Sequence, residues 1–124
     1  MNIIDTSGWL EYFTDGKNAD FFSKPILDKS KLIIVPVVII YEVFKKVLIE
    51  AGEDKALETI GQFQKYKIEN IDDTISLSAA KISYKNKIPM ADSIIYAVTL
   101  KYDAILWTQD EYFEKLRNVK YIRK

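Results

Sequence analysis

Five short segments of strand character recur along this chain, and helical patterns separate them. The segments are residues 1–4, 32–35, 68–71, 104–107 and 119–122. Short runs that are apolar on both faces are typical of parallel strands covered by helices. Strands that alternate with helices favour a parallel sheet, so we predict an α/β fold: three α/β/α layers around a central parallel sheet of four to five strands. At 124 residues the chain has the usual length of one domain, and we expect a single domain over residues 1–124.

The helices are predicted from apolar residues at helical spacing between these strands. They cover residues 9–13, 19–27, 37–51, 53–66, 74–85, 91–102 and 108–116. Pro25 lies inside the second helix and predicts a kink or two short pieces. Gly52 follows the third helix and suits a C-cap. The fourth helix is expected to bury Leu57, Ile60 and Phe63, and the fifth carries Leu77, Ala80 and Tyr84 at helical spacing.

Whole classes of active site are excluded because the chain has no histidine and no cysteine. There can be no Ser-His-Asp triad, no imidazole base, no thiolate nucleophile and no zinc site with imidazole or thiolate ligands. Catalysis must therefore use carboxylates, lysines, tyrosines or hydroxyl groups. Any metal site would have oxygen ligands only, which favours Mg²⁺ or Mn²⁺. The 18 basic and 18 acidic residues cancel, so only local charged patches could attract a nucleic acid.

Four acidic residues are predicted to meet at one edge of the sheet. Asp5 directly follows the first strand, and Asp110 comes three residues after the fourth. Glu42 lies early in the helix after the second strand, and Asp92 opens the helix that leads into the fourth strand. In a parallel α/β fold these positions all lie at the carboxyl edge of the sheet, where ligands bind. The sequence therefore predicts a cluster of four carboxylates.

Each of these carboxylates also has an ordinary structural explanation. The explanations are an N-cap neighbour for Asp5, a surface ion pair with Lys45 or Lys46 for Glu42, a helix-dipole carboxylate for Asp92 and a Thr108–Glu111 capping box around Asp110. None of them explains why all four would share one edge. Clustered carboxylates repel unless a cation neutralises them, and Mg²⁺ or Mn²⁺ is the natural cation. Such an ion activates water and stabilises charge on a phosphoryl group, so we expect hydrolysis of phosphodiesters or phosphate esters.

The segments that carry these carboxylates resemble the PIN-domain family, in particular the VapC-type toxins of bacterial and archaeal toxin–antitoxin pairs. The matching stretches are residues 3–10, 41–45, 89–95 and 106–110. Each stretch is short, but the set of four in this order is fairly specific and extends over essentially the whole chain. The resemblance implies a metal-dependent endoribonuclease that hydrolyses RNA phosphodiesters with metal-activated water. It also implies homodimerisation and inhibition by a cognate antitoxin protein.

The resemblance further implies roles for individual residues. The implied ligands of Mg²⁺ or Mn²⁺ are Asp5, Asp92 and Asp110, with Glu42 binding the metal or orienting the attacking water. Ser7 and Thr108 would hold carboxylates or waters around the ion. Many relatives carry another acidic residue two positions after the last motif aspartate, where this chain has Tyr112. The number of metal ions, one or two, therefore stays open.

RNA binding would need basic and aromatic groups beside the acidic site. The basic candidates are Lys45 and Lys46, together with Arg117, Lys120, Arg123 and Lys124 near the end of the sequence. The candidates for stacking on bases are Tyr41, Tyr96 and Tyr112. The alternative is that the lysines are solvated surface residues and the tyrosines are partly buried in helix packing. In the first two helices Trp9, Tyr12, Phe13, Phe21 and Phe22 form either ordinary core or a groove for a partner segment.

Two other functional classes stay open. A receiver-like phosphoacceptor domain has a similar sheet, but it would want an acidic pair after the first strand, where only Asp5 stands. A catalytically silent PIN-like module would bind RNA or protein, although binding needs no set of four carboxylates. The longest apolar run, residues 32–41, is too short to span a bilayer, and the first residues form a strand rather than a secretion signal. We therefore expect a soluble cytoplasmic protein with no membrane partner.

Overall fold

The computed structural model describes all residues, 1–124, and contains five short strands, six α-helices and two 3₁₀ helices. The strands are β1 (Asn2–Ile4), β2 (Ile34–Pro36), β3 (Lys67–Glu69), β4 (Ile105–Thr108) and β5 (Val119–Tyr121). The α-helices are α1 (Thr6–Thr14), α2 (Ala19–Leu27), α3 (Val37–Ala51), α4 (Glu53–Gly61), α5 (Asp73–Asn86) and α6 (Met90–Lys101). The 3₁₀ helices are η1 (Gln62–Lys65) and η2 (Glu111–Phe113). None of the helices is long and apolar enough to cross a membrane.

All strand pairings are parallel, and the strands lie in the order β3-β2-β1-β4-β5. β1 pairs with β4, where Ile3 lies opposite Leu106. β2 and β3 form a separate pair that meets β1 at a single bridge between Asn2 and Ile33. The chain thus extends the sheet from β1 to β3 and then returns to place β4 on the other side of β1. The carboxyl ends of β1 and β4 therefore form the topological switch point, where open α/β sheets usually bind ligands.

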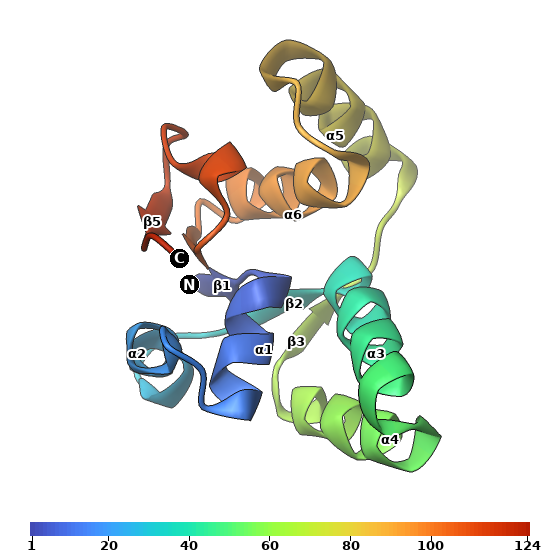
Figure 1. Ribbon diagram of the computed structural model, residues 1–124. Helices are drawn as coiled ribbons and strands as arrows, with labels where there is room; N and C mark the ends of the chain where they lie inside the picture. Colours follow the sequence, from blue (N-terminus) through green and yellow to red (C-terminus); the bar gives the residue numbers. More distant parts are fainter.

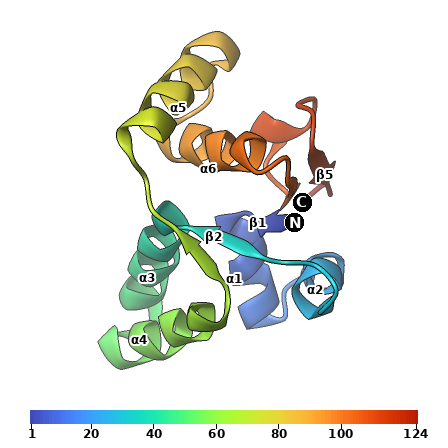
Figure 2. The same cartoon turned by 180° about the vertical axis from the view of Figure 1, so that it is seen from behind.

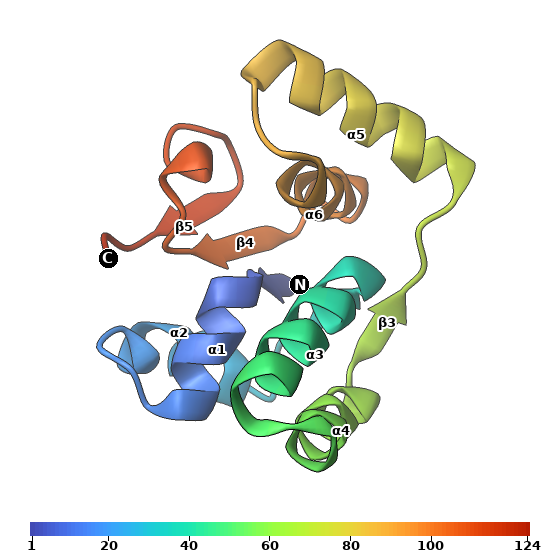
Figure 3. The ribbon, with the colours of Figure 1, turned by 45° about the vertical axis from the view of Figure 1, so that its right-hand side comes forward.

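Helices cover both faces of the sheet, which confirms the predicted three layers. α1, α2, α3 and α4 lie on one face, and α5 and α6 lie on the other (Figure 1). The same layers are seen from behind in Figure 2 and after a 45° turn in Figure 3. The core that joins the layers includes Ile3, Ile4, Val35 and Leu106 from the strands and Phe22, Ile39, Val43, Ile95 and Val98 from the helices. All of these side chains are fully buried, so the strands contact helices on both sides.

Two helices differ from their predicted continuity or from their predicted ends. α2 is a single helix despite Pro25, because this proline lies in the last turn, where its missing N–H removes only one backbone hydrogen bond. The predicted helix 53–66 is α-helical only as far as Gly61 and continues as η1. Gly52 does end α3, with a φ of 88° that favours glycine, as predicted.

The predicted helix over residues 108–116 is wrong, since only the short η2 forms there. The Oγ1 atom of Thr108 accepts the backbone N–H of Asp110 at 2.9 Å, and Asp110 Oδ1 accepts the N–H of Tyr112 at 2.9 Å. These local bonds give the backbone an alternative to helix hydrogen bonds. The N-cap of η2 is therefore Asp110, and no capping box with Thr108 at the N-cap forms.

The buried faces of α4 and α5 also differ from the predicted pattern. The buried residues are Ala56 and Thr59 on α4, Phe63 on η1, and Ile75 and Ala79 on α5. By contrast, Leu57 is 55% exposed, and Leu77 and Tyr84 on α5 are 67% and 86% exposed. Each helix carries two sets of apolar residues at helical spacing, and packing against α3 or α6 selects only one of them.

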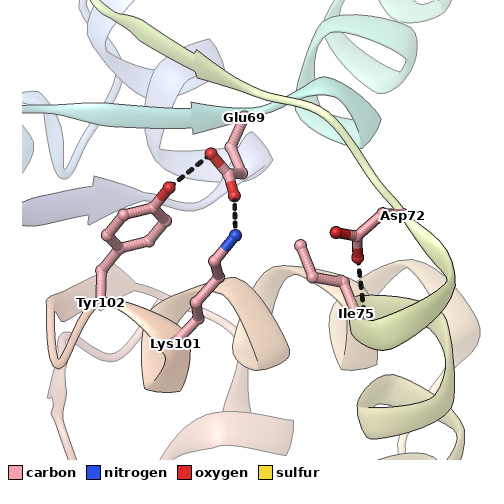
Figure 4. A network of polar contacts seen from close by, with 5 residues as sticks. All are labelled: Glu69, Asp72, Ile75, Lys101 and Tyr102. Atoms are coloured by element: carbon pink, nitrogen blue, oxygen red, sulfur yellow. Dashed lines mark hydrogen bonds and ion pairs between the residues drawn. The ribbon is translucent and has the colours of Figure 1, made fainter.

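A buried carboxylate ties β3 to the end of α6 (Figure 4). Glu69, the last residue of β3, accepts a hydrogen bond from Lys101 Nζ at 2.6 Å and another from the Tyr102 hydroxyl at 2.6 Å. Burial raises the pKa of Glu69, but the hydrogen bonds from Lys101 and Tyr102 outweigh it and the pKa is lowered overall. Nearby, Asp72 caps α5 by accepting the N–H of Ile75 at 2.8 Å.

Candidate active site

The ends of β1 and β4 bring Asp5 and Asp110 to the switch point of the sheet. Asp5 caps α1, and its Oδ1 accepts the backbone N–H of Thr6 at 2.8 Å. Its Oδ2 accepts the hydroxyl of Thr108, at the end of β4, at 2.8 Å. Because Asp5 is only 3% exposed, these two bonds fix the orientation of its carboxyl group. The Thr108 hydroxyl also accepts the backbone N–H of Asp110, so one side chain links the Asp5 carboxylate to the backbone of Asp110.

Glu42 and Asp92 reach the same rim from helices on opposite faces of the sheet. Glu42 lies in the second turn of α3, and its Oε1 accepts the hydroxyl of Thr6 at 2.6 Å. Asp92 lies in the first turn of α6. Its carboxyl group is close enough to Asp5, Asp110 and Glu42 to be repelled by all three. The structure thus brings the four predicted carboxylates into electrostatic contact.

Burial and mutual repulsion disfavour the charged forms of two of these groups. The pKa of Asp5 is raised to about 6, first by burial and then by the negative charges of Asp110 and Glu42, while hydrogen bonds to its charged form oppose the rise. The pKa of Asp92 is raised to about 7, first by burial, then by the charges of Asp5, Asp110 and Glu42, and by a hydrogen bond with Asp110. Both carboxyl groups therefore take up protons as the pH falls to neutral and below, and a bound cation would compete with those protons.

The chemistry of this donor set fits a hard divalent cation. Every candidate ligand is a carboxylate oxygen, and a cation among them would offset the mutual repulsion that adds to burial in raising both pKa values. No three acidic side chains converge into a ready-made coordination shell. Asp5 is held by hydrogen bonds at both of its oxygens, whereas Glu42 and Asp110 are each held at one.

Thr6 is a residue of the site that the sequence interpretation missed. Its hydroxyl holds Glu42, whereas the Oγ atom of the neighbouring Ser7 is buried without a hydrogen-bond partner. Both hydroxyls follow Asp5 directly, so the motif alone does not distinguish them. Neighbours on a helix point about 100° apart, and the helix direction could have identified the hydroxyl that faces α3. Thr108, in contrast, makes the carboxylate contact that its position suggests.

A polar cavity of about 840 Å³ opens beside Asp110. Its walls include Glu111, Tyr112, Glu114, Tyr121, Arg123 and Lys124. Asn18 Nδ2 donates to Gln109 Oε1 at 2.8 Å and to the carbonyl of Arg123 at 3.2 Å, which ties the last residues to the cavity wall. Two of the basic residues considered for RNA, Arg123 and Lys124, therefore lie next to the carboxylate rim.

The other basic candidates are distributed differently. Lys46 forms an ion pair with Glu50 at 3.0 Å, so its charge is already matched. Lys45 forms no ion pair, and its Nζ lies 5.9 Å from the centre of the Tyr41 ring. Lys120 lies over the ring of Trp107, on β4. Only Lys45 of the first pair is thus free to meet a phosphate.

The three tyrosines considered for base stacking differ in how exposed they are. Tyr96 is 4% exposed, and its hydroxyl donates to the carbonyl of Arg117 at 2.8 Å, so it belongs to the interior. Tyr41 and Tyr112 are 63% and 52% exposed. Of the three candidates, only Tyr41 and Tyr112 have rings that an unpaired base could reach.

The aromatic residues of α1 and α2 divide between the core and a groove. Trp9 and Phe22 are buried, whereas Tyr12, Phe13 and Phe21 are half-buried. A groove of about 320 Å³ runs past Trp9, Tyr12 and Phe13, and its walls also include Leu27, Lys29, Lys31 and Lys65. Trp9 and Phe22 therefore belong to the core, Tyr12 and Phe13 line a groove, and the binding of a partner segment there stays a prediction.

The geometry is that of an α/β/α domain with four coupled carboxylates at its switch point, a class in which metal-dependent nucleases occur. A sequence model described as "PIN domain" matches residues 3–119. The chain therefore belongs to the PIN-domain family. The receiver-like alternative is set aside, because in such domains β1 lies between β2 and β3, whereas here it lies between β2 and β4.

Solved structures support the same fold at low sequence identity. VapC20 of Mycobacterium tuberculosis, described as a sarcin-ricin loop cleaving toxin, has a TM-score of 0.82 at 14% identity, with 100% of each chain covered. A chain of a toxin-antitoxin complex from Klebsiella pneumoniae has a TM-score of 0.78 at 16% identity, covering 97% of this chain and 96% of that one. A chain of VapBC2 from Rickettsia felis, bound to a promoter DNA fragment, has a TM-score of 0.77 at 12% identity, covering 98% and 97%. No curated protein sequence matches the chain.

Proposed function

We propose that this PIN domain is a metal-dependent endoribonuclease, the toxin of a VapC-type toxin–antitoxin pair, which hydrolyses RNA phosphodiesters. The observation that carries the proposal is the meeting of Asp5, Glu42, Asp92 and Asp110, from four separate elements, at the β1–β4 switch point. Structural neighbours described as VapC or VapBC proteins, one of them a sarcin-ricin loop cleaving toxin, support it.

The surroundings of each carboxylate suggest its role. Mg²⁺ or Mn²⁺, when bound, would supply Lewis acidity and lower the pKa of a nucleophilic water. Asp5 is the fixed ligand because Thr108 and the Thr6 N–H hold both its oxygens. Asp92 and Asp110 complete the set. Glu42, oriented by the Thr6 hydroxyl, binds the ion or positions the attacking water.

Two observations favour the second candidate, a catalytically silent module that binds RNA or protein. No three acidic side chains form a ready-made shell, and Tyr112 stands where many relatives carry a further acid. A silent module would not need four mutually repelling carboxylates, which cost stability unless a ligand neutralises them. The nuclease is therefore our first proposal.

The test is cleavage of a long structured RNA by purified protein in Mg²⁺ or Mn²⁺, with EDTA and Asp92→Asn as negative controls. Asp54→Asn, an exposed residue of α4, is the matched control for loss of one charge. We expect cleavage that EDTA abolishes, that Asp92→Asn lowers by roughly 10²-fold or more and that Asp54→Asn leaves unchanged. Metal binding by calorimetry accompanies the assay. Absence of both cleavage and metal binding would leave the silent module as the better reading.

The proposed partner is a cognate antitoxin whose segment docks in the groove beside Tyr12 and Phe13. Apolar walls and three lysines on the rim suit a segment with apolar anchors and acidic flanks. Leu27, on the wall, is 65% exposed. We expect Leu27→Asp to lose co-purification of the antitoxin while RNA cleavage stays unchanged. Structural neighbours from toxin–antitoxin complexes support such a partner.

We further propose that the protein is a homodimer that acts in the cytoplasm as a single domain over residues 1–124. Exposed apolar residues on α3 support self-association. They are Tyr41, Leu48 and Ile49. Surfaces of this kind are typical of interfaces between protein chains.

A further inference from the structure

A second cavity, of about 420 Å³, lies between α5, α6 and the turn before β5. Four of its lining residues are cations: Lys81 and Lys85 from α5, and Lys115 and Arg117 from the turn. No acidic residue lines it. Figure 1 shows the three segments on the same face of the sheet. We call these four residues the cationic cluster.

The charges of the cationic cluster are unmatched within the protein. The three ion pairs of the structure involve Lys46, Lys55 and Lys101, and none involves the cluster. The chain has no net charge, so this local excess of four positive charges is not a consequence of composition. Like charges around one cavity repel one another, which costs free energy, and an anion bound between them would remove that cost.

A purely structural role explains only part of the cluster. Lys85 lies in the last turn of α5, where a cation interacts favourably with the helix dipole. That explanation does not reach Lys115 or Arg117, which come from a different segment. The turn is held in place because the Tyr96 hydroxyl donates to the carbonyl of Arg117 at 2.8 Å. This hydrogen bond therefore fixes the position of the turn that carries two of the four cations.

The cavity is connected to the carboxylate rim through α6. Its lining includes Tyr96, which lies four residues after Asp92 and so on the same side of the helix. Leu100, the other α6 residue of the lining, lies eight residues after Asp92. Four and eight residues of α-helix advance about 6 and 12 Å, so the cavity lies about one to two helical turns along α6 from Asp92. A chain of phosphates bound in the cavity would thus pass close to Asp92.

We propose that the cationic cluster binds the phosphate backbone of single-stranded RNA and positions the strand for cleavage at the carboxylate rim. This inference rests on the proposed function, because it takes RNA to be the substrate. The cluster contributes binding rather than chemistry, so its residues are positioning residues. Lysine and arginine contacts to phosphates make affinity fall steeply with salt, with a slope of about 0.7 per phosphate for single strands.

The test is fluorescence anisotropy of a labelled single-stranded RNA with the full chain carrying Asp92→Asn, at several KCl concentrations. The variants are the pairs Lys81→Gln with Lys85→Gln and Lys115→Gln with Arg117→Gln. The matched control is Lys17→Gln with Lys55→Gln, two exposed lysines outside the cavity that remove the same charge. The conservative pair is Lys85→Arg with Arg117→Lys. Circular dichroism verifies that each variant is folded.

We expect each pair of glutamines to weaken binding about tenfold and to lower the salt slope by about 1.4, as the loss of two phosphate contacts requires. The control and the conservative pair should keep parental binding. In the active protein the same glutamine pairs should raise KM and leave kcat unchanged, because uniform binding is lost. Weakened RNA binding without any cleavage by the parent would support the cluster while refuting the nuclease.

Two results would overturn the proposal. One is RNA affinity within twofold of the parent in both glutamine pairs. The other is that a titration with inorganic phosphate saturates the cavity and RNA binding is not lost. The second result would identify a site for a free phosphate and not for a nucleic-acid backbone.

Discussion

The Thr108 hydroxyl donates to Asp5 Oδ2 across 2.8 Å and so joins the carboxyl ends of β1 and β4. We expect Thr108→Val to lower kcat/KM for RNA cleavage by roughly 10–100-fold, the range seen when groups that orient a metal ligand are lost. Because the lost bond favours the charged form of Asp5, its pKa should rise further, and the pH profile should shift to higher pH. Thr108→Ser keeps the hydroxyl and should retain activity. Equal loss in the serine and valine variants would contradict this role.

Metal binding should weaken as the pH falls, because protons compete for the carboxylates. The raised pKa values, about 6 for Asp5 and about 7 for Asp92, mean that the metal-free site holds protons below neutral pH. We expect affinity for Mn²⁺ by calorimetry to rise between pH 5.5 and 8, by roughly tenfold per pH unit for each proton displaced. Buffers of different ionisation enthalpy should report proton release. Affinity that is constant over this range would show that these groups do not bind the ion.

Glu69 should stabilise the fold through its bonds to Lys101 and Tyr102. We expect Glu69→Gln to lower the free energy of unfolding by about 1 kcal/mol or more, measured in urea at pH 7. The folded-state pKa of Glu69 lies below its usual value of 4.5, so its contribution is present above that value and is lost as the pH falls through the lowered pKa. The difference between the two proteins should therefore shrink at acid pH. Glu58→Gln, in an exposed ion pair of 3.7 Å, should have little effect.

Gly8 lets α1 pack closely against β1 and α2. A Cβ atom there would lie 2.5 Å from the Phe22 ring and 2.8 Å from Ile4 Cγ2, both in the core. We expect Gly8→Ala to destabilise the protein by about 1–3 kcal/mol, as overpacking of a core does. The control is Gly61→Ala, where a Cβ meets nothing within 4 Å and the helix should gain stability. Equal melting temperatures for the two variants would refute the close packing.

The exposed apolar residues of α3 should matter for self-association. Sedimentation velocity should show that Leu48→Glu with Ile49→Glu shifts the protein toward monomer, because two buried charges oppose an apolar interface. Leu57→Glu places the same charge on α4, where Leu57 is 55% exposed, and should leave the oligomeric state unchanged. A parent protein that is monomeric at all concentrations would refute the homodimer itself.

The sequence alone determined the layers of the fold and the composition of the candidate site. Alternation of apolar strands with helical patterns is a local property, so it predicted α3 to the residue and the other elements approximately. The absence of histidine and cysteine limited the chemistry to oxygen ligands, and the carboxyl-edge rule gathered Asp5, Glu42, Asp92 and Asp110. The local rule failed over residues 108–116, where side-chain hydrogen bonds compete with the helix.

Only the tertiary structure decided which surfaces meet. Strand order depends on which pairing buries the whole chain best. No single segment therefore determines that β4 returns to the side of β1 and forms the switch point there. The same holds for the buried side of α5, because packing against α6 buries Ile75 and leaves Leu77 exposed although both are apolar. The tertiary structure also decided which hydroxyl binds Glu42, since Thr6 and Glu42 are 36 residues apart in the sequence. Periodicity fixes the spacing of side chains along an element, whereas long-range contacts fix the direction in which they point.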